Sequence, residues 1–164
     1  MFSSSLSLFA TIGILIASAH AETHTVVFDN RCGFGTPTLI QGPRVLGTGN
    51  GPFHINGPLT GAIAYLQTGK CGFNGEGCTL VETTLKNPTC PGCGSSTDIS
   101  LIPPHSFSVT SGFGYFNGCD KAGADCTNAN CPTAFHKPSD TFVQIPCQAD
   151  NLSFSLFSDL DRSG

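Results

Sequence analysis

Charged side chains are scarce in this sequence, with seven Lys or Arg and eleven Asp or Glu among 164 residues and a formal net charge of −4. A nucleic-acid-binding surface needs clustered Lys and Arg, so the charge balance argues against that class of partner. So few charges beside 20 glycines also exclude a coiled coil and a charged, disordered chain. Glycine and proline instead punctuate the chain every few residues, as short strands joined by tight turns require.

Long hydrophobic runs are also lacking. The apolar stretch at residues 6–17 is shorter than the roughly 20 residues that a membrane-spanning helix needs. Together with the small residues of Ala19-His20-Ala21, it predicts a secretory signal peptide at residues 1–21, cleaved after Ala21. We therefore expect a protein exported to the extracellular space or the cell wall, without a membrane partner.

Motifs for metal, cofactor or serine chemistry are missing from the sequence. His24, His54, His105 and His136 are scattered, with no His-x-x-x-His pair and no zinc-finger spacing of cysteines. No Gly-x-Ser-x-Gly turn offers a serine nucleophile. Neither a metal site nor a cofactor is therefore expected.

Cysteine, by contrast, is abundant, and all nine cysteines follow the predicted cleavage site. Export places them in an oxidising compartment where disulfides persist, but an odd number leaves one outside any set of pairs. Cys90-Pro-Gly-Cys93 has the spacing of a redox motif, yet it lies in a turn and lacks the helix that activates such a thiolate. We interpret it as a local Cys90–Cys93 staple.

Strand-like stretches recur where long helical periodicity is absent. In residues 152–156 the large apolar side chains occupy every second position, so they share one sheet face while the serines face water. Short strands at such spacing predict an all-β sandwich or barrel in one domain, residues 22–157, followed by a polar, frayed tail at residues 158–164. The predicted strands are residues 24–29, 36–40, 61–68, 79–85, 98–102, 106–110, 141–145 and 152–157.

Six blocks of the sequence, taken in order, carry a family resemblance. They are residues 24–32 (HTVVFDNRC), 68–71 (TGKC) followed by Cys78, 79–85 (TLVETTL), 97–101 (TDISL), 131–135 (CPTAF) and 142–147 (FVQIPC). They resemble the strands and hairpins of thaumatin-like proteins, which implies an antiparallel β-sandwich stapled by disulfides. Only four residues separate Cys126 from Cys131, where full-length members carry a helical, cysteine-rich insertion. The chain therefore resembles a short form without that second lobe.

The same resemblance implies the bridges Cys71–Cys78, Cys119–Cys147 and Cys126–Cys131. In the family, the first cysteine pairs with a cysteine just after the final strand, but here Ser158 stands at that point. Cys32 is thereby left outside the implied bridges, which accounts for the odd number of cysteines.

Family members that bind or cleave glucans use an acidic cleft built from one arginine and several carboxylates. By position, Glu82 and Asp98 match two of these acids and Asp140 is an approximate third, whereas Gln67 replaces the arginine. Glycosidic cleavage needs two carboxyl groups either about 5 Å or about 6.5–9.5 Å apart, so Glu82 and Asp98 are the candidate catalytic pair if neighbouring strands aim them at one face. The plainer interpretation is that both are ordinary solvated charges, because a fold does not carry a function with it.

Two further features are candidates for ligand contact or modification. The glycine-flanked segment Phe113-Gly-Tyr-Phe116 is interpreted as an exposed aromatic cluster, so Tyr115 and Phe116 join the three acids as carbohydrate-binding candidates. Asn151, in an Asn-Leu-Ser sequence, is the candidate glycosylation site.

Three functions follow as hypotheses. The first is non-catalytic binding of cell-wall β-glucan by a secreted defence protein, and the second is a weak endo-β-1,3-glucanase. The third is a protein-binding module, such as an inhibitor of secreted hydrolases or a secreted effector. A monomer is expected, with a polysaccharide or a secreted protein as its partner.

The predicted processing is directly testable. The exported protein should begin at Glu22, because cleavage follows Ala21. N-terminal sequencing of the secreted chain checks this, and an intact Met1 or another first residue would contradict it.

Overall fold

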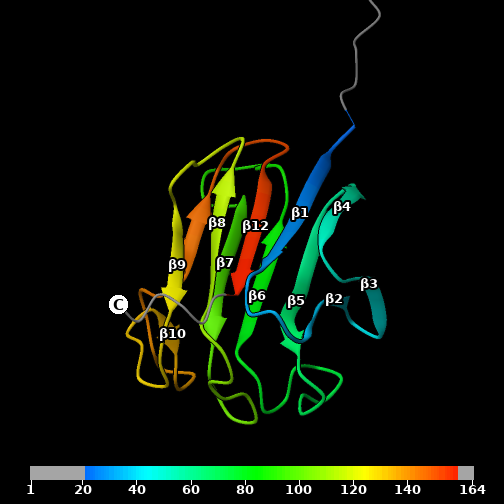
Figure 1. Ribbon diagram of the computed structural model, residues 1–164. Helices are drawn as coiled ribbons and strands as arrows, with labels where there is room; N and C mark the ends of the chain where they lie inside the picture. The colour runs from blue at the N-terminus through cyan, green and yellow to red at the C-terminus, as the bar shows by residue number, and fades with distance from the viewer. Residues whose placement is uncertain (1–20, 159–164) are drawn as a thin grey trace, which may run out of the picture.

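Two β-sheets packed face to face make up the computed structural model, which describes residues 21–158 (Figure 1). The first sheet has the strand order β4-β1-β12-β8-β9, and the second has the order β10-β7-β6-β5-β2-β3, with β11 also paired to β7. The described residues contain no helix, so the predicted all-β class is confirmed. The strands are β1 (Thr23–Asn30), β2 (Thr36–Gln41), β3 (Arg44–Thr48), β4 (Gly51–Asn56), β5 (Leu59–Gln67), β6 (Leu80–Leu85), β7 (Ser95–Ser100), β8 (Ser111–Phe116), β9 (Gly123–Cys126), β10 (Ala134–Phe135), β11 (Ile145–Cys147) and β12 (Ser153–Ser158).

The first and last strands lie side by side at the centre of the first sheet. β1 and β12 pair in parallel, in a register that runs from Thr25 opposite Ser153 to Asn30 opposite Ser158. The short pair of β10 with β7 is also parallel, while the remaining pairs are antiparallel. The sandwich is therefore mixed rather than purely antiparallel.

The hydrophobic core fills the space between the two sheets. Alternation along each strand sends every second side chain inward, where it leaves water and contributes to stability. Ser153 departs from the expected pattern, because it is buried and lies 3.4 Å from the Asn117 side-chain amide instead of facing water. The core side chains include Val26, Phe28, Phe113, Phe154 and Leu156 from the first sheet and Leu39, Ala64, Val81 and Ile99 from the second.

Several predicted strands lie elsewhere than the sequence indicated. Residues 106–110 are not a strand, and β8 occupies residues 111–116 instead. Most of residues 141–145 form a loop, with β11 starting only at Ile145. Strands β3 and β4 were not predicted, because turn-forming Gly, Asn and Pro dominate that part of the sequence.

Four disulfides staple the sandwich: Cys71–Cys78, Cys90–Cys93, Cys119–Cys147 and Cys126–Cys131. The structure thus brings together each pair that the sequence analysis named, and Cys32 lies outside the four bridges. Cys32 lies just after β1, two residues beyond Asn30, which pairs with Ser158. Residues 1–20, with nearly all of the predicted signal peptide, and residues 159–164, with most of the predicted tail, lie outside the described residues.

A chain of buried polar groups connects the two sheets through the core. The Tyr115 hydroxyl of β8 lies 2.9 Å from Oγ1 of Thr97 and 3.0 Å from the carbonyl oxygen of Ile145. Oγ1 of Thr97 in turn lies 2.6 Å from Oγ1 of Thr83. Each hydroxyl has one proton to donate, so all three bonds form when Thr83 donates to Thr97, Thr97 to Tyr115 and Tyr115 to the Ile145 carbonyl.

This chain predicts the effect of removing one oxygen atom. Tyr115→Phe should keep the packing of the ring but leave the Ile145 carbonyl and the Thr97 hydroxyl buried without that partner. We expect the free energy of unfolding to fall by roughly 1–3 kcal/mol, the usual cost of such a group. Urea unfolding measures this, and an unchanged free energy would show that the hydroxyl chain contributes nothing to stability.

Candidate functional site

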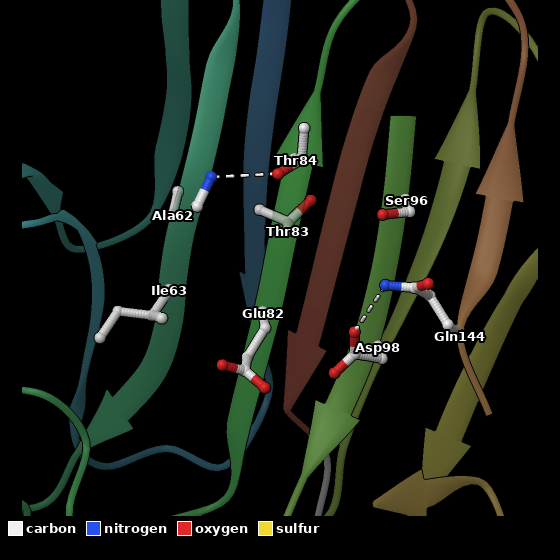
Figure 2. A pocket seen from close by; sticks show the side chains of 9 residues that line it. Ala62, Ile63, Glu82, Thr83, Thr84, Ser96, Asp98 and Gln144 are labelled. Carbon is white, nitrogen blue, oxygen red and sulfur yellow. Dashed lines mark hydrogen bonds between the residues drawn. The ribbon is translucent and has the colours of Figure 1, made fainter. Parts of the chain in front are cut away.

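Glu82 and Asp98 lie together on the outer face of the second sheet (Figure 2). Glu82 of β6 pairs directly with Asp98 of β7, so the pleat sends both side chains to the same face. The Cβ atoms of such opposed residues are about 4.5–5.5 Å apart. The condition set by the sequence analysis, that neighbouring strands aim the two carboxyl groups at one face, is therefore met.

Polar groups surround the two acids in a shallow pocket of about 220 Å³. Its edge on β5 contains a β-bulge, at which Gly61 has a φ of +59° and donates its backbone N–H to Oγ1 of Thr84 at 3.0 Å. A bulge of this kind re-aims the backbone locally. The pocket is lined by Gly61, Ala62, Ile63, Glu82, Thr83, Thr84, Ser96, Asp98 and Gln144.

Asp98 is the most perturbed group of the pocket. Its side chain is buried, with the residue only 6% exposed, and Nε2 of Gln144 donates to Oδ2 at 3.4 Å. Oδ1 is also buried and makes no hydrogen bond of good geometry within the described structure. Burial, followed by the charge of neighbouring Glu82, raises the pKa of Asp98 from 3.8 to about 7, although the Gln144 amide opposes the shift. Asp98 therefore keeps its proton far longer than a solvated carboxyl group does.

The third acid and the residue in the arginine position lie outside this pocket. Asp140 belongs to the loop between β10 and β11, where Oδ2 accepts the backbone N–H groups of His136 and Lys137 at 2.8 and 3.1 Å. These bonds lower the pKa of Asp140, and the bond from the His136 N–H has the largest effect. Gln67 closes its own turn: Oε1 accepts the Gly69 N–H and Nε2 donates to the Cys71 carbonyl. Neither side chain completes an acidic cleft with Glu82 and Asp98.

The expected exposed aromatic cluster is wrong for Phe113 and Tyr115. The Phe-Gly-Tyr spacing places both rings on the same face of β8, and that face is the core side. Tyr115 is 3% exposed, and burial raises the pKa of its hydroxyl to about 12. It has no surface to offer a sugar, whereas Phe116 lies at the end of β8 and is half-buried.

Asn151 occupies an exposed turn just before β12. Its Oδ1 accepts the backbone N–H of Thr23 at 2.9 Å and lies 3.3 Å from Nδ2 of Asn87. The amide oxygen therefore holds the turn, and glycosylation of the amide nitrogen stays a prediction.

Thr84, Ser96 and Gln144 line the pocket but were missed in the sequence. Strand alternation alone could have found the first two, since they lie two residues from Glu82 and Asp98 on the same strands. Gln144 comes from a different segment, just before β11, and its position opposite Asp98 follows only from the pairing of Ile145 with Thr97. No signal in the sequence discloses that pairing.

Metal and membrane chemistry find no support in the described part of the chain. Residues 21–158 hold no cluster of three or more His, Cys, Asp or Glu side chains arranged for a metal ion. Within the same residues there is no helix of the length and apolarity needed to cross a membrane.

Comparison with known proteins yields a similarity to solved structures and none to family models or curated proteins. No protein-family model matches the chain, and no curated protein does. Among solved structures, the thaumatin-like xylanase inhibitor TLXI matches with 15% identity and a TM-score of 0.48, over 82% of this chain and 97% of that one. The chain is similar to a thaumatin-like protein. This is the family whose motifs the sequence resembles.

The raised pKa of Asp98 predicts that Asp98→Asn stabilises the protein by an amount that depends on pH. Between about pH 4 and pH 7 the unfolded chain releases the Asp98 proton while the folded chain retains it, so the wild-type protein loses stability as pH rises. Asn cannot ionise and escapes this loss. The free energy of unfolding of the variant, taken relative to that of wild type, should therefore be higher at pH 8 than at pH 4 by on the order of 2 kcal/mol.

Urea unfolding of both proteins at the two pH values measures this difference. A stability difference that is the same at pH 4 and pH 8 would contradict the raised pKa.

Proposed function

We propose that this chain is an exported, thaumatin-like protein that binds a β-glucan-type polysaccharide through the Glu82–Asp98 pocket without cleaving it. The observation that carries the proposal is the direct pairing of two carboxyl groups in a pocket otherwise rich in hydroxyl and amide groups. The disulfides and the predicted signal peptide support an extracellular setting.

The chemistry of the pocket suits a neutral, polyhydroxylated ligand. Exposed Glu82 accepts hydrogen bonds from sugar hydroxyls, and hydrogen bonds to a charged acceptor are about twice as strong as neutral ones. Thr84, Ser96 and Gln144 offer groups that both donate and accept. A negatively charged ligand would instead meet the carboxylate of Glu82 and be repelled.

The burial of Asp98 argues against cleavage. A general acid must come within about 2.6–3.2 Å of the oxygen that it protonates. One carboxyl oxygen of Asp98 is buried, and the other lies against the Gln144 amide. Binding needs only the exposed Glu82 and the rim of the pocket, so it does not require Asp98 to move.

A weak endo-β-1,3-glucanase is the second candidate, because one specific observation favours it. A retaining glycosidase uses two carboxyl groups about 5 Å apart, one of them kept protonated by a raised pKa. Asp98, with a pKa of about 7 beside Glu82, meets that electrostatic requirement.

A sedimentation assay on insoluble β-1,3-glucan, with reducing sugars measured in the same samples, tests the proposal. The wild-type protein should bind and release no sugar. Glu82→Gln should weaken binding at least about tenfold, because a charge-assisted hydrogen bond is lost at the centre of the site. The melting temperature should stay nearly constant, since exposed charges contribute little to stability.

Asp29→Asn is the matched control. Asp29 lies on β1 in the first sheet and forms an exposed ion pair with Arg31, so the substitution removes the same charge away from the pocket. Equal binding by Glu82→Gln and wild type would remove the pocket from the proposal. Sugar release that Glu82→Gln abolishes would establish the glucanase. If the wild-type protein neither binds the glucan nor releases sugar, any role on this glucan is contradicted and the protein-binding module is favoured.

A further inference from the structure

Phe142 is the most exposed large hydrophobic residue in the described chain. It is 99% exposed, and its φ of +69° places it in the left-handed region, which is unfavourable for a bulky side chain. Burying a phenylalanine side chain normally stabilises a protein, and Phe142 forgoes this contribution in the isolated protein. Such an outlier is a reason to look for a binding role.

The loop that carries Phe142 is braced on both sides. Before it, Asp140 accepts two backbone N–H groups and donates its own N–H to the Lys137 carbonyl at 3.0 Å. After it, Gln144 donates to Asp98, and β11 is held to β7 by strand pairing and to β8 by the Tyr115 hydroxyl. The ring therefore projects from a segment whose backbone is held on both sides, and little backbone freedom remains to be lost on binding.

The braced loop leads directly into the Glu82–Asp98 pocket. Phe142 is two residues from Gln144, so their Cα atoms lie at most about 7 Å apart. Gln144 itself lines the pocket and contacts Asp98, as Figure 2 shows. The pocket's own lining contains no aromatic ring. An exposed apolar ring and a residue of the polar pocket thus lie two positions apart on one continuous segment.

We infer that Phe142 is a stacking platform for a second sugar unit of the glycan whose neighbouring unit occupies the Glu82–Asp98 pocket. This inference rests on the proposed function. A pyranose ring has hydroxyls around its rim and C–H groups on its faces, and those faces pack on the electron-rich face of a phenyl ring. The pocket supplies polar contacts to the rim of one unit, and Phe142 supplies an apolar contact to the face of the next.

Chain length of the ligand gives a specific test. Affinities for soluble β-1,3-gluco-oligosaccharides of increasing length should be measured by calorimetry for wild type and Phe142→Ala. The variant should bind the shortest sugar that occupies the pocket as wild type does, but lose roughly three- to tenfold on the longer ones. Phe142→Trp should keep the increase of affinity with oligosaccharide length, because it retains an aromatic face.

Phe34→Ala is the control for loss of an exposed ring. Phe34 is 44% exposed and lines a separate hollow with Thr68 and Lys70, so its removal should leave every affinity unchanged. An equal loss for short and long sugars, or no loss at all, would overturn the role of Phe142 while the pocket stands. A lowered melting temperature for Phe142→Ala would also overturn it, by showing that the ring is structural. If wild type binds none of the sugars and not the insoluble glucan, both this inference and the proposed function fail.

Discussion

The parallel pairing of β1 with β12 is the contact on which the rest of the sandwich depends. These strands are the central pair of the first sheet, with β4 beyond one and β8 and β9 beyond the other. Without this pairing, the sheet would divide into a two-stranded ribbon, β4 with β1, and a three-stranded piece, β12 with β8 and β9. An isolated two-stranded ribbon is marginally stable in water. Val26, Phe28, Phe154 and Leu156 also enter the core from this pair, so the second sheet packs on it. The contact joins residues more than 120 positions apart, and it cannot form until most of the chain is in place.

Alternate residues of β6 and β7 face opposite sides of the sheet and have different roles. On the inner face, Thr83 and Thr97 begin the hydroxyl chain that reaches Tyr115 and the other sheet. The neighbouring residue on each strand, Glu82 before Thr83 and Asp98 after Thr97, faces outward into the pocket. The pocket is consequently built on two strands whose opposite face is anchored in the core. A buried carboxyl group with one unbonded oxygen, as at Asp98, is costly, so it depends on such anchored surroundings.

What the sequence predicted well follows from regular alternation. β1, β6 and β12 alternate clearly or are rich in strand formers, and the structure contains strands close to the predicted ranges. β8 was misplaced because glycines between its aromatic residues look like a flexible, exposed segment, although in the sheet they simply occupy the other face. Glu82 and Asp98 could be paired by their family positions. Gln144 and Phe142 could not be placed beside them, because a loop with a left-handed residue has no periodicity from which to infer its path.

The parallel register of β1 and β12 has a practical consequence for handling the protein. Because both strands run the same way, the start of β1 and the end of β12 lie at opposite ends of the first sheet (Figure 1). A linker that joined those two points in a circular permutant would have to span a whole strand, about 23 Å for seven residue steps, instead of a tight turn. For a surface-immobilised sensor, the choice of attachment end would likewise decide which end of the sandwich faces the solution.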